Sequence, residues 1–196
     1  MRIGALREFL EAAIAAAILA LFVRTFLVQA WAVPSPSMED TLLVGDQILI
    51  NRYVFGPRAG GALGPNRALR RGDVVVFRHP EDPRRDVVKR VAALPGETVE
   101  IAAGRLIVDG EARPLPPSAR PAAESYGPLR VPAGSFFALG DNQADSGDSR
   151  RFGPVPLESV RGRALLVYWS FVEERRRGPL GWWRATRWSR LFTPVR

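Results

Sequence analysis

The chain of 196 residues has no cysteine and only one histidine, His79. The lack of cysteine excludes disulfide bonds, thiol catalysis and zinc sites built on thiolates. A single histidine excludes a multi-histidine metal centre, so we expect no metal and no cofactor. It also leaves only His79 for a Ser-His-Asp triad, and this residue lies in a charged stretch with two prolines, FRHPEDPRR.

Lysine is almost absent as well, because the 28 basic residues are 27 arginines and Lys89. Lys89 lies two positions from both Val87 and Val91, so a strand would place these three side chains on one face. Burial lowers the pKa of a lysine and allows it to act as a base, whereas an arginine stays protonated. The alternative is an ordinary surface lysine. Lys89 is therefore a candidate general base.

The net charge is +8 and the isoelectric point is about 11.1. Such a chain suits an anionic partner, either lipid headgroups or nucleic acid, although an arginine-rich composition gives the same charge without any such partner. The sequence has no phosphate loop, dinucleotide fingerprint or nucleic-acid motif. We therefore do not expect nucleic acid as a partner.

Long apolar runs are confined to the N-terminal part of the chain. Residues 12–23, AAIAAAILALFV, have no polar side chain, and after Arg24 and Thr25 the run continues to Val33. As a helix, 12–33 would be about 33 Å long, enough to cross a bilayer. Arg2 and Arg7 precede it, which places the N-terminus in the cytoplasm. We predict a cytoplasmic tail (1–8), a transmembrane anchor (9–33) and an extracytoplasmic domain (34–196).

Two alternatives remain for this segment. A cleaved signal peptide would also have a basic start and a short apolar core, with Val28-Gln29-Ala30 as a poor cleavage site. A buried core helix is the other alternative. The apolar residues that follow Arg24 favour the anchor.

The remainder of the chain has the composition of a β protein. Short β-branched runs separated by Gly, Pro and Asp predict strands at 46–54, 73–78, 86–94, 98–103, 105–110, 135–140 and 163–171. No long segment with helical periodicity occurs between 42 and 172, so we expect a mainly β, antiparallel domain. Residues 56–72 and 113–132 are rich in Gly and Pro and read as loops.

The C-terminal stretch GPLGWWRATRWSRLF interleaves tryptophan with arginine. This pattern fits a segment that lies at a membrane interface. It fits equally well an aromatic flap that packs on the β domain.

Two further motifs contain groups that could carry chemistry. In VPSPSMEDTL (33–42), Ser37 and Asp40 match a helix-capping pattern, but Ser37 also lies just beyond the predicted anchor, where a nucleophile would meet substrates leaving the bilayer. The segment GDNQADSGDSRRFG (140–153) reads as a polar loop. It does not fit a calcium loop, because Ser146 and Phe152 occupy the positions that need Gly and Glu. It is either a solvated turn or a loop that supports a site.

Four stretches follow the apolar segment in a fixed order: VPSPSMEDTLLVGDQILINRYVFG, RGDVVVF, VVKRVAALPGE and GDNQADSGDSRRFGPVP. Together they resemble the bacterial type I signal peptidase (leader peptidase) family over most of residues 10–165. The resemblance implies a membrane-bound serine endopeptidase with a Ser/Lys dyad on an antiparallel β fold. Its substrates would be the signal peptides of exported preproteins, cut after a small residue at an A-x-A site close to the secretion translocon.

The same resemblance implies roles for four residues of the reaction centre. Ser37 matches the nucleophile, and Lys89 matches the general base. Ser35 matches the hydroxyl that joins the Ser37 backbone N–H in the oxyanion hole. Ser146 matches the serine that orients the lysine amine.

Five further positions match supporting residues of the family. Asp148 and Arg150 match an ion pair, and Asp141 matches the aspartate that opens the last motif. Val33 and Val88 match residues that line shallow apolar pockets for small substrate side chains.

The chain also departs from the family pattern in two places. Gln143, Ala144 and Asp145 replace the usual Arg-Asp-Asn, which puts the support of that loop in doubt. The region 98–132 is too short for the large second β domain of some members, and we expect a reduced insertion of little more than a hairpin and a loop.

Two rival functions remain open. A related Ser/Lys peptidase could process one dedicated substrate. A basic, membrane-anchored β protein could instead bind anionic lipid or nucleic acid without any catalysis.

Overall fold

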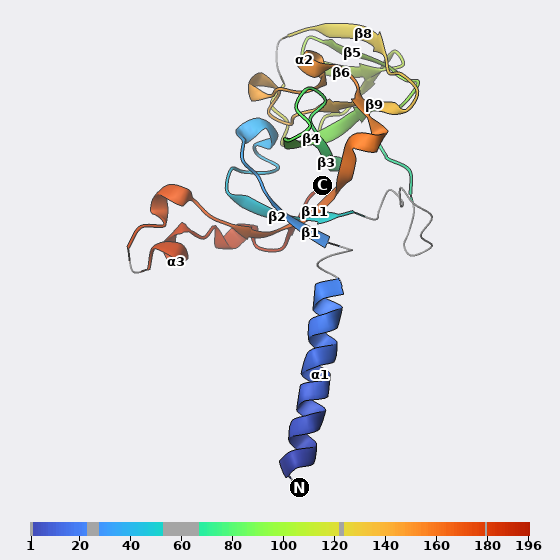
Figure 1. Cartoon of the computed structure of the whole chain (residues 1–196). Coiled ribbons are helices and arrows are strands. Elements are labelled where there is room, and N and C mark those ends of the chain that lie inside the picture. Colours follow the sequence, from blue (N-terminus) through green and yellow to red (C-terminus); the bar gives the residue numbers. More distant parts are fainter. Residues whose placement is uncertain (1, 23–27, 53–66, 122–123, 179) are drawn as a thin grey trace.

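The computed structural model describes residues 2–22, 28–52, 67–121, 124–178 and 180–196. Figure 1 shows the helix α1 (Arg2–Phe22) below a β-domain formed by the remaining described residues. The two sheets of this domain are antiparallel throughout, as the sequence predicts.

The larger sheet has eight strands in the order β1-β2-β11-β3-β4-β9-β10, with β12 paired to β11. These strands are β1 (Val28–Ala32), β2 (Asp46–Asn51), β3 (Val74–Arg78), β4 (Asp86–Ala93), β9 (Ser135–Leu139), β10 (Val155–Pro156), β11 (Val160–Ser170) and β12 (Thr193–Pro194). β3 and β4 are buried on both faces, which explains their nearly continuous runs of valine.

The smaller sheet has the order β7-β6-β5-β8 and lies at the top of Figure 1. It consists of β5 (Thr98–Ala102), β6 (Arg105–Val108), β7 (Glu111–Arg113) and β8 (Tyr126–Arg130). The turns Ala103-Gly104 and Asp109-Gly110 have positive φ at both residues, the geometry that favours tight hairpins. The prediction of little more than a hairpin was therefore wrong, because 98–130 forms a four-stranded sheet.

The seven predicted strands are all confirmed, with boundaries shifted by a few residues. Short elements connect them: α2 (Ser149–Phe152), α3 (Gly181–Ala185) and the single turns η2 (Pro36–Met38), η3 (Gln143–Asp145), η4 (Leu157–Ser159), η5 (Glu173–Arg175) and η6 (Trp188–Arg190). The predicted loop 56–72 lies mostly outside the described residues. The predicted loop 113–132 contains a strand, β8, which the sequence interpretation missed.

The N-terminal prediction of one membrane helix over 9–33 needs correction. The helix ends at Phe22, and Val28–Ala32 is strand β1, which pairs with β2 along its whole length. Val33 is 2% exposed and donates its N–H to the carbonyl of Asp46. The described part of the second apolar run, residues 28–33, therefore belongs to the β-domain. Among the described helices, none is long and apolar enough to cross a bilayer.

Candidate active site

The segment after β1 forms a tight turn that presents Ser37. Pro36 opens the turn η2, and Met38 is fully buried in the core, so the backbone on both sides of Ser37 is fixed. Ser37 is only 4% exposed. Its carbonyl accepts the N–H of Asn142 at 3.1 Å. The capping interpretation of Ser37 and Asp40 was wrong, because the turn has no side-chain cap and the Asp40 carboxylate pairs with Arg120.

Lys89 lies on β4 and is 3% exposed, so it is not a surface lysine. Its Nζ donates a hydrogen bond to the Oγ of Ser37. Burial lowers the pKa of Lys89 from its ordinary value of 10.5 to about 8, and the Arg85 guanidinium adds to this effect. The carboxylates of Asp148 and Asp141 oppose it, but burial is the larger effect. Lys89 can therefore lose its proton near neutral pH.

A hollow of about 220 Å³ opens over these two side chains. Ser35 also lines it, and its Oγ lies 3.2 Å from the Oγ of Ser37. Of the two valines predicted to form substrate pockets, Val88 lines the hollow, whereas Val33 does not. Both valines belong to the same buried cluster, so the pocket role of Val33 stays a prediction.

His79 also lines the hollow, but the described structure contains no hydrogen bond between His79 and Ser37. Its ring packs edge-on against Phe152, and its Nδ1 accepts the N–H of Glu81 at 3.2 Å. A triad based on His79 therefore has no geometric support.

Ser146 lies behind the nucleophile turn, next to Gly140. A Cβ at Gly140 would lie 2.2 Å from the Ser146 Oγ and 2.5 Å from the Ser37 carbonyl oxygen. This contact explains why glycine is needed at 140. The Ser146 Oγ is buried and has no hydrogen-bond partner in the described part of the chain. Its predicted role in orienting the Lys89 amine stays a prediction.

Asp148 and Arg150 form the ion pair that the resemblance implies. The Asp148 carboxylate is fully buried and accepts from the Arg150 Nε and Nη2, both at 2.9 Å, and from the Gly140 N–H at 3.0 Å. Arg150 also donates to the Gln143 carbonyl at 2.7 Å. The pair thereby fixes the loop 140–150, and its carboxylate places a negative charge near Lys89.

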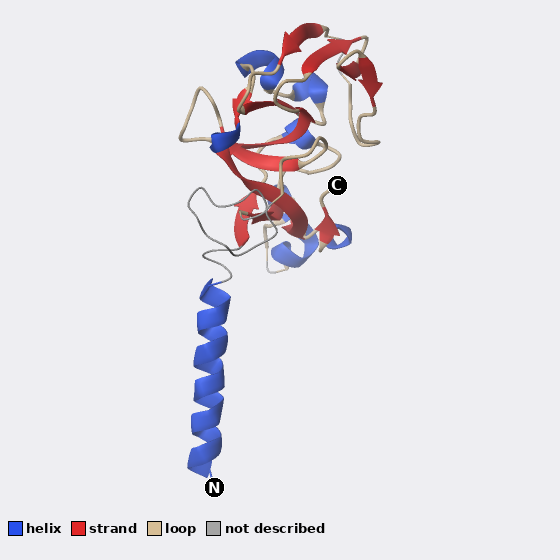
Figure 2. Cartoon of the chain, turned by 90° about the vertical axis from the view of Figure 1, so that its right-hand side faces the viewer, coloured by secondary structure: helices blue, strands red, loops and turns tan. Residues whose placement is uncertain are grey.

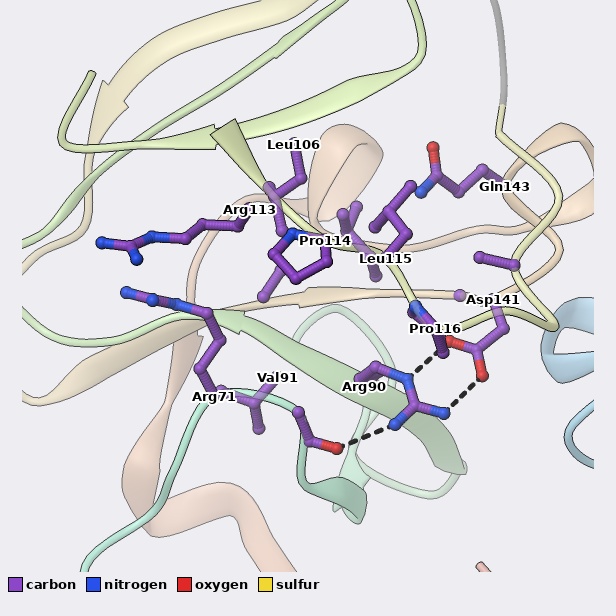
Figure 3. Close-up of a pocket in the computed structure, with 15 residues that line it drawn as sticks. Arg71, Arg90, Val91, Leu106, Arg113, Pro114, Leu115, Pro116, Asp141 and Gln143 are labelled. Carbon is purple, nitrogen blue, oxygen red and sulfur yellow. Dashed lines mark hydrogen bonds and ion pairs between the residues drawn. The ribbon is translucent and has the colours of Figure 1, made fainter. Parts of the chain in front are cut away.

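Asp141 forms an ion pair with Arg90, the residue that follows Lys89 in the chain. The Arg90 Nε and Nη2 donate to its two oxygens at 2.8 and 2.7 Å, and this pair lies in a second hollow of about 520 Å³ (Figure 3). Arg90 also donates to the carbonyl of Gly72 at 2.8 Å. Lys89 and Arg90 are adjacent on a strand, so they leave opposite faces, one toward Ser37 and one toward Asp141.

A segment that the sequence did not single out also contacts the nucleophile turn. Residues 114–121, here called the strap, cross between that turn and the loop 140–150. The Arg120 backbone donates to the Asp141 carbonyl at 2.7 Å and accepts from the Gln143 N–H at 2.9 Å. Its guanidinium binds Asp40 through two bonds of 2.9 and 2.8 Å, and the Ser118 hydroxyl lies 2.7 Å from that of Thr41.

The strap supplies support at the point where the last motif departs from the family pattern. The Gln143 N–H donates to the Arg120 carbonyl, and the Gln143 carbonyl accepts from the Arg150 guanidinium. Sequence reasoning missed Arg120 because the contact spans 80 residues, and a proline-rich stretch gives no pairing signal. Asn142 and Ser149 were missed as well, although their place inside the polar motif could have pointed to them.

This arrangement can perform nucleophilic catalysis. A hydroxyl next to a buried amine with a lowered pKa can lose its proton, and a neighbouring hydroxyl and backbone N–H can stabilise an oxyanion. Within the described ranges, no group of three or more metal-ligating side chains could hold a metal ion. The paired Ser37 hydroxyl and buried Lys89 amine are the groups that a serine hydrolase with a lysine base would need.

Comparison with known proteins identifies the family. Residues 6–169 match the family model described as "Signal peptidase, peptidase S26". The chain belongs to this family of signal peptidases, and it is a peptidase.

Curated relatives agree with this assignment. The chain is 37% identical over 162 residues to a signal peptidase I of Leptolyngbya laminosa, covering 78% of this chain and 74% of that protein. It is 32% identical over 200 residues to the probable signal peptidase I-1 of Synechocystis, covering 97% and 91%. A crystal structure of a signal peptidase I from Enterococcus faecalis V583 aligns with a TM-score of 0.42 and 30% identity, over 50% of this chain and 97% of that one.

Proposed function

We propose that the protein removes N-terminal signal peptides from exported preproteins, with Ser37 as nucleophile and Lys89 as general base. The hydrogen bond between the buried Lys89 amine and the Ser37 hydroxyl carries this proposal. The family assignment supplies the substrate class, since the relatives are named signal peptidases. The β-domain, which begins with β1 at Val28, would be the catalytic domain.

The first half of the reaction is acylation. Neutral Lys89 takes the proton of Ser37, and the Ser37 Oγ attacks the carbonyl carbon of the small residue that precedes the scissile bond. The Ser35 hydroxyl and the Ser37 N–H bind the oxyanion, each donor contributing about 3–4 kcal/mol in comparable sites. When the tetrahedral intermediate collapses, the peptide C–N bond breaks, and the Lys89 ammonium returns its proton to the amine of the mature protein.

The second half releases the signal peptide. Neutral Lys89 takes a proton from a water molecule, and the hydroxide attacks the acyl-enzyme ester. The ester bond breaks, Ser37 recovers its proton from Lys89, and the released carboxylic acid of the signal peptide loses its proton to solvent. Ser146 would orient the amine, and Asp141, Asp148 and Arg150 would hold the loop around it. Val33 and Val88 would restrict the substrate to small side chains at an A-x-A site.

We also propose that the N-terminal apolar segment, of which α1 is the described part, attaches the enzyme to the plasma membrane in a single pass, with the N-terminus in the cytoplasm and the β-domain outside. α1 lies apart from both sheets in two views (Figures 1 and 2). The described side chains of this helix, at 7–19 and 21, are all exposed, including large apolar ones at Phe9, Leu10, Ile14, Ile18, Leu19 and Leu21. Water is a poor environment for such a helix, and lipid is a good one. The active site would then face preproteins as they leave the translocon.

The test is cleavage of a preprotein in detergent, with product masses measured for wild type, Ser37→Ala and Lys89→Arg. Lys89→Arg keeps the charge but removes the ability to accept a proton at neutral pH. We expect the wild type to cut after a small residue and both variants to lose at least a thousandfold in rate, as for other nucleophile–base pairs. Equal cleavage by Lys89→Arg would disprove the dyad.

The same assay separates the rival functions. Cleavage of several unrelated preproteins supports a general enzyme, and cleavage of one alone supports a dedicated peptidase. Failure to cut any preprotein, combined with salt-sensitive binding that survives Ser37→Ala, would favour the non-catalytic alternative. Extraction of cell membranes with alkaline carbonate tests attachment, because an integral protein stays in the pellet.

A further inference from the structure

Asn142 lies next to the nucleophile turn and contacts it twice. Its backbone N–H donates to the Ser37 carbonyl at 3.1 Å, and its side-chain Nδ2 donates to the Pro36 carbonyl at 3.3 Å. A carbonyl oxygen can only accept a hydrogen bond, so the amide nitrogen, and not the amide oxygen, faces Pro36. Asn142 is 6% exposed, which leaves water little access to these contacts. One residue therefore holds both peptide groups that flank Ser37.

The peptide group between Pro36 and Ser37 supplies the backbone donor of the proposed oxyanion hole. Its carbonyl belongs to Pro36 and its N–H belongs to Ser37. The two point in opposite directions, because this peptide is trans and planar. A rotation of the peptide plane would turn the N–H away from the oxyanion. The hydrogen bond from the Asn142 Nδ2 to the Pro36 carbonyl opposes this rotation.

The peptide group between Ser37 and Met38 is fixed from the other side. Its carbonyl accepts the Asn142 N–H, and the Met38 side chain is fully buried in the core. When both flanking peptide groups are fixed, the two backbone dihedrals of Ser37 are fixed as well. The direction in which the Ser37 Oγ leaves the backbone, toward the Lys89 Nζ, then follows from these contacts.

The nucleophile turn is too short to hold this geometry by itself. Within the turn, the Glu39 N–H donates to the Pro36 carbonyl at 2.9 Å. This bond closes a single 3₁₀ turn, whose hydrogen-bond geometry is poorer than that of an α-helix. Ser35 precedes the turn and provides no side-chain cap. Support from outside the turn is therefore needed, and Asn142 provides it.

Asn142 is itself held in place, because the loop on both sides of it is bound to the strap. The Arg120 N–H donates to the Asp141 carbonyl at 2.7 Å, and the Arg120 carbonyl accepts the Gln143 N–H at 2.9 Å. The Asp141 carbonyl and the Asn142 N–H belong to one peptide group. A continuous chain of hydrogen bonds therefore runs from the strap through this group to the Ser37 carbonyl, and such chains strengthen each member.

We infer that Asn142 is a positioning residue of the oxyanion hole, whose Nδ2 holds the 36–37 peptide plane so that the Ser37 N–H points at the oxyanion. The inference rests on the proposed function and deepens it, since Asn142 acts through Ser37. A donor that is oriented before the reaction stabilises the transition state without any reorganisation during the chemical step. Asn142 should therefore affect the chemical step and not the binding of substrate.

The experiment compares wild type, Asn142→Ala and Asn142→Asp in the detergent cleavage assay. Asn142→Ala removes the side-chain donor and keeps the backbone N–H. Asn142→Asp fills the same volume but places an acceptor against the Pro36 carbonyl, and it keeps the test valid if the alanine variant does not fold. Removal of one oxyanion donor lowers kcat by a factor of about 10²–10³. A donor that is present but misaligned should lower kcat about tenfold to a hundredfold, with KM unchanged.

Ala144→Asp is the matched control for the added charge. It places a carboxylate at an exposed position of the same loop, where the alanine side chain has no hydrogen bond to lose. We expect kcat of this variant to equal that of wild type.

Binding of a peptide aldehyde separates a positioning role from a general loss of structure. The Ser37 Oγ adds to the aldehyde carbon, the Ser37 proton passes to Lys89, and the aldehyde oxygen becomes an oxyanion. The corresponding peptide alcohol fits the same subsites but cannot form this adduct. Asn142→Ala should weaken binding of the aldehyde about tenfold to a hundredfold and leave the affinity for the alcohol unchanged. The pH at which kcat/KM rises should not move.

Three outcomes would overturn the inference. The first is wild-type kcat in both Asn142 variants. The second is an equal loss of affinity for the aldehyde and the alcohol, which would indicate a damaged substrate pocket. The third is an altered pH profile in Asn142→Ala, which would place the effect on Lys89. If wild type cuts the preprotein, each of these rejects only the role of Asn142. Absence of cleavage by wild type rejects the proposed function and the inference with it.

Discussion

The Lys89 Nζ donates a hydrogen bond to the Ser37 Oγ across 52 residues of sequence, and both side chains are almost completely buried. Strand β4 and turn η2 bring the two groups together, and each is fixed by the core that surrounds it. This relationship brings together the proposed nucleophile and the proposed base, and it buries the amine, which lowers its pKa. The predictions below test its separate parts.

Activity should depend on the protonation of Lys89. The pKa of this group is about 8, so the rate constant kcat/KM should rise as the pH increases through about 8, where the neutral amine becomes dominant. The measurement is a pH profile of preprotein cleavage from about pH 6 to pH 10. His79→Ala should leave the profile unchanged. A step near the ordinary histidine pKa that disappears in this variant would contradict the assignment.

Lys89→Met should raise stability while it abolishes activity. The folded pKa of about 8 lies below the ordinary 10.5, so the unfolded chain binds more protons between these values, and stability rises with pH in that window. Below pH 8 the amine is charged in both the folded and the unfolded state, so the folded protein bears the full free-energy cost of burying the charge. At pH 7 the variant should gain up to about 3 kcal/mol, at about 1.4 kcal/mol for each pKa unit. Urea unfolding at pH 7 measures this, and a loss of stability would contradict it.

Gly140→Ala should inactivate the enzyme. The new methyl group would overlap the Ser146 hydroxyl and the Ser37 carbonyl, and the second contact is with backbone, which cannot rotate away. A displaced nucleophile turn should lower kcat at least a hundredfold, as small misplacements of reacting groups do. Gly147→Ala is the matched control, because nothing lies within 4 Å of a Cβ at that position. Similar kinetics for both variants would show that the close approach at 140 is irrelevant.

Arg120→Ala should reduce kcat with little effect on stability. Exposed ion pairs contribute less than about 1 kcal/mol, so the fold should tolerate the loss of the Asp40 contact. The turn that follows Ser37 would, however, lose its ionic link to the strap and keep only the Thr41–Ser118 contact, and we expect a decrease of about tenfold in kcat, equal to about 1.4 kcal/mol. Arg105→Ala on the smaller sheet is the control. Kinetics equal to wild type in both variants would remove the strap from the reaction.

Much of the fold was predictable from the sequence because its strands carry local signals. The sequence alone predicts β3 and β4 from their valine runs. It also predicts the two hairpin turns of the smaller sheet. β1 was not predictable, because its sequence VQAWA continues the apolar run of the helix before it, and its pairing with β2 shows it to be a strand. β8 was hidden by its proline and glycine.

The residues of the candidate site likewise fall into those that the sequence predicts and those that it does not. Ser37 and Lys89 were predicted from a motif and from the rarity of lysine, and the structure places them in contact. Arg120 and Ser118 could not be predicted, since their role depends on contacts with residues about 80 positions away. The contribution of Ser146 stays a prediction, because no hydrogen bond joins it to Lys89 in the described residues.

The adjacency of Lys89 and Arg90 limits the insertions and deletions that β4 can tolerate. Neighbouring residues of a strand face opposite ways, so one inserted or deleted residue before position 89 would exchange their surroundings. The Arg90 guanidinium, which never loses its proton, would then lie next to the Ser37 hydroxyl. The Lys89 amine would face Asp141 in place of the guanidinium that donates to both carboxylate oxygens. The number of residues in β4 before Lys89 is therefore set by the chemistry on the two faces of this strand.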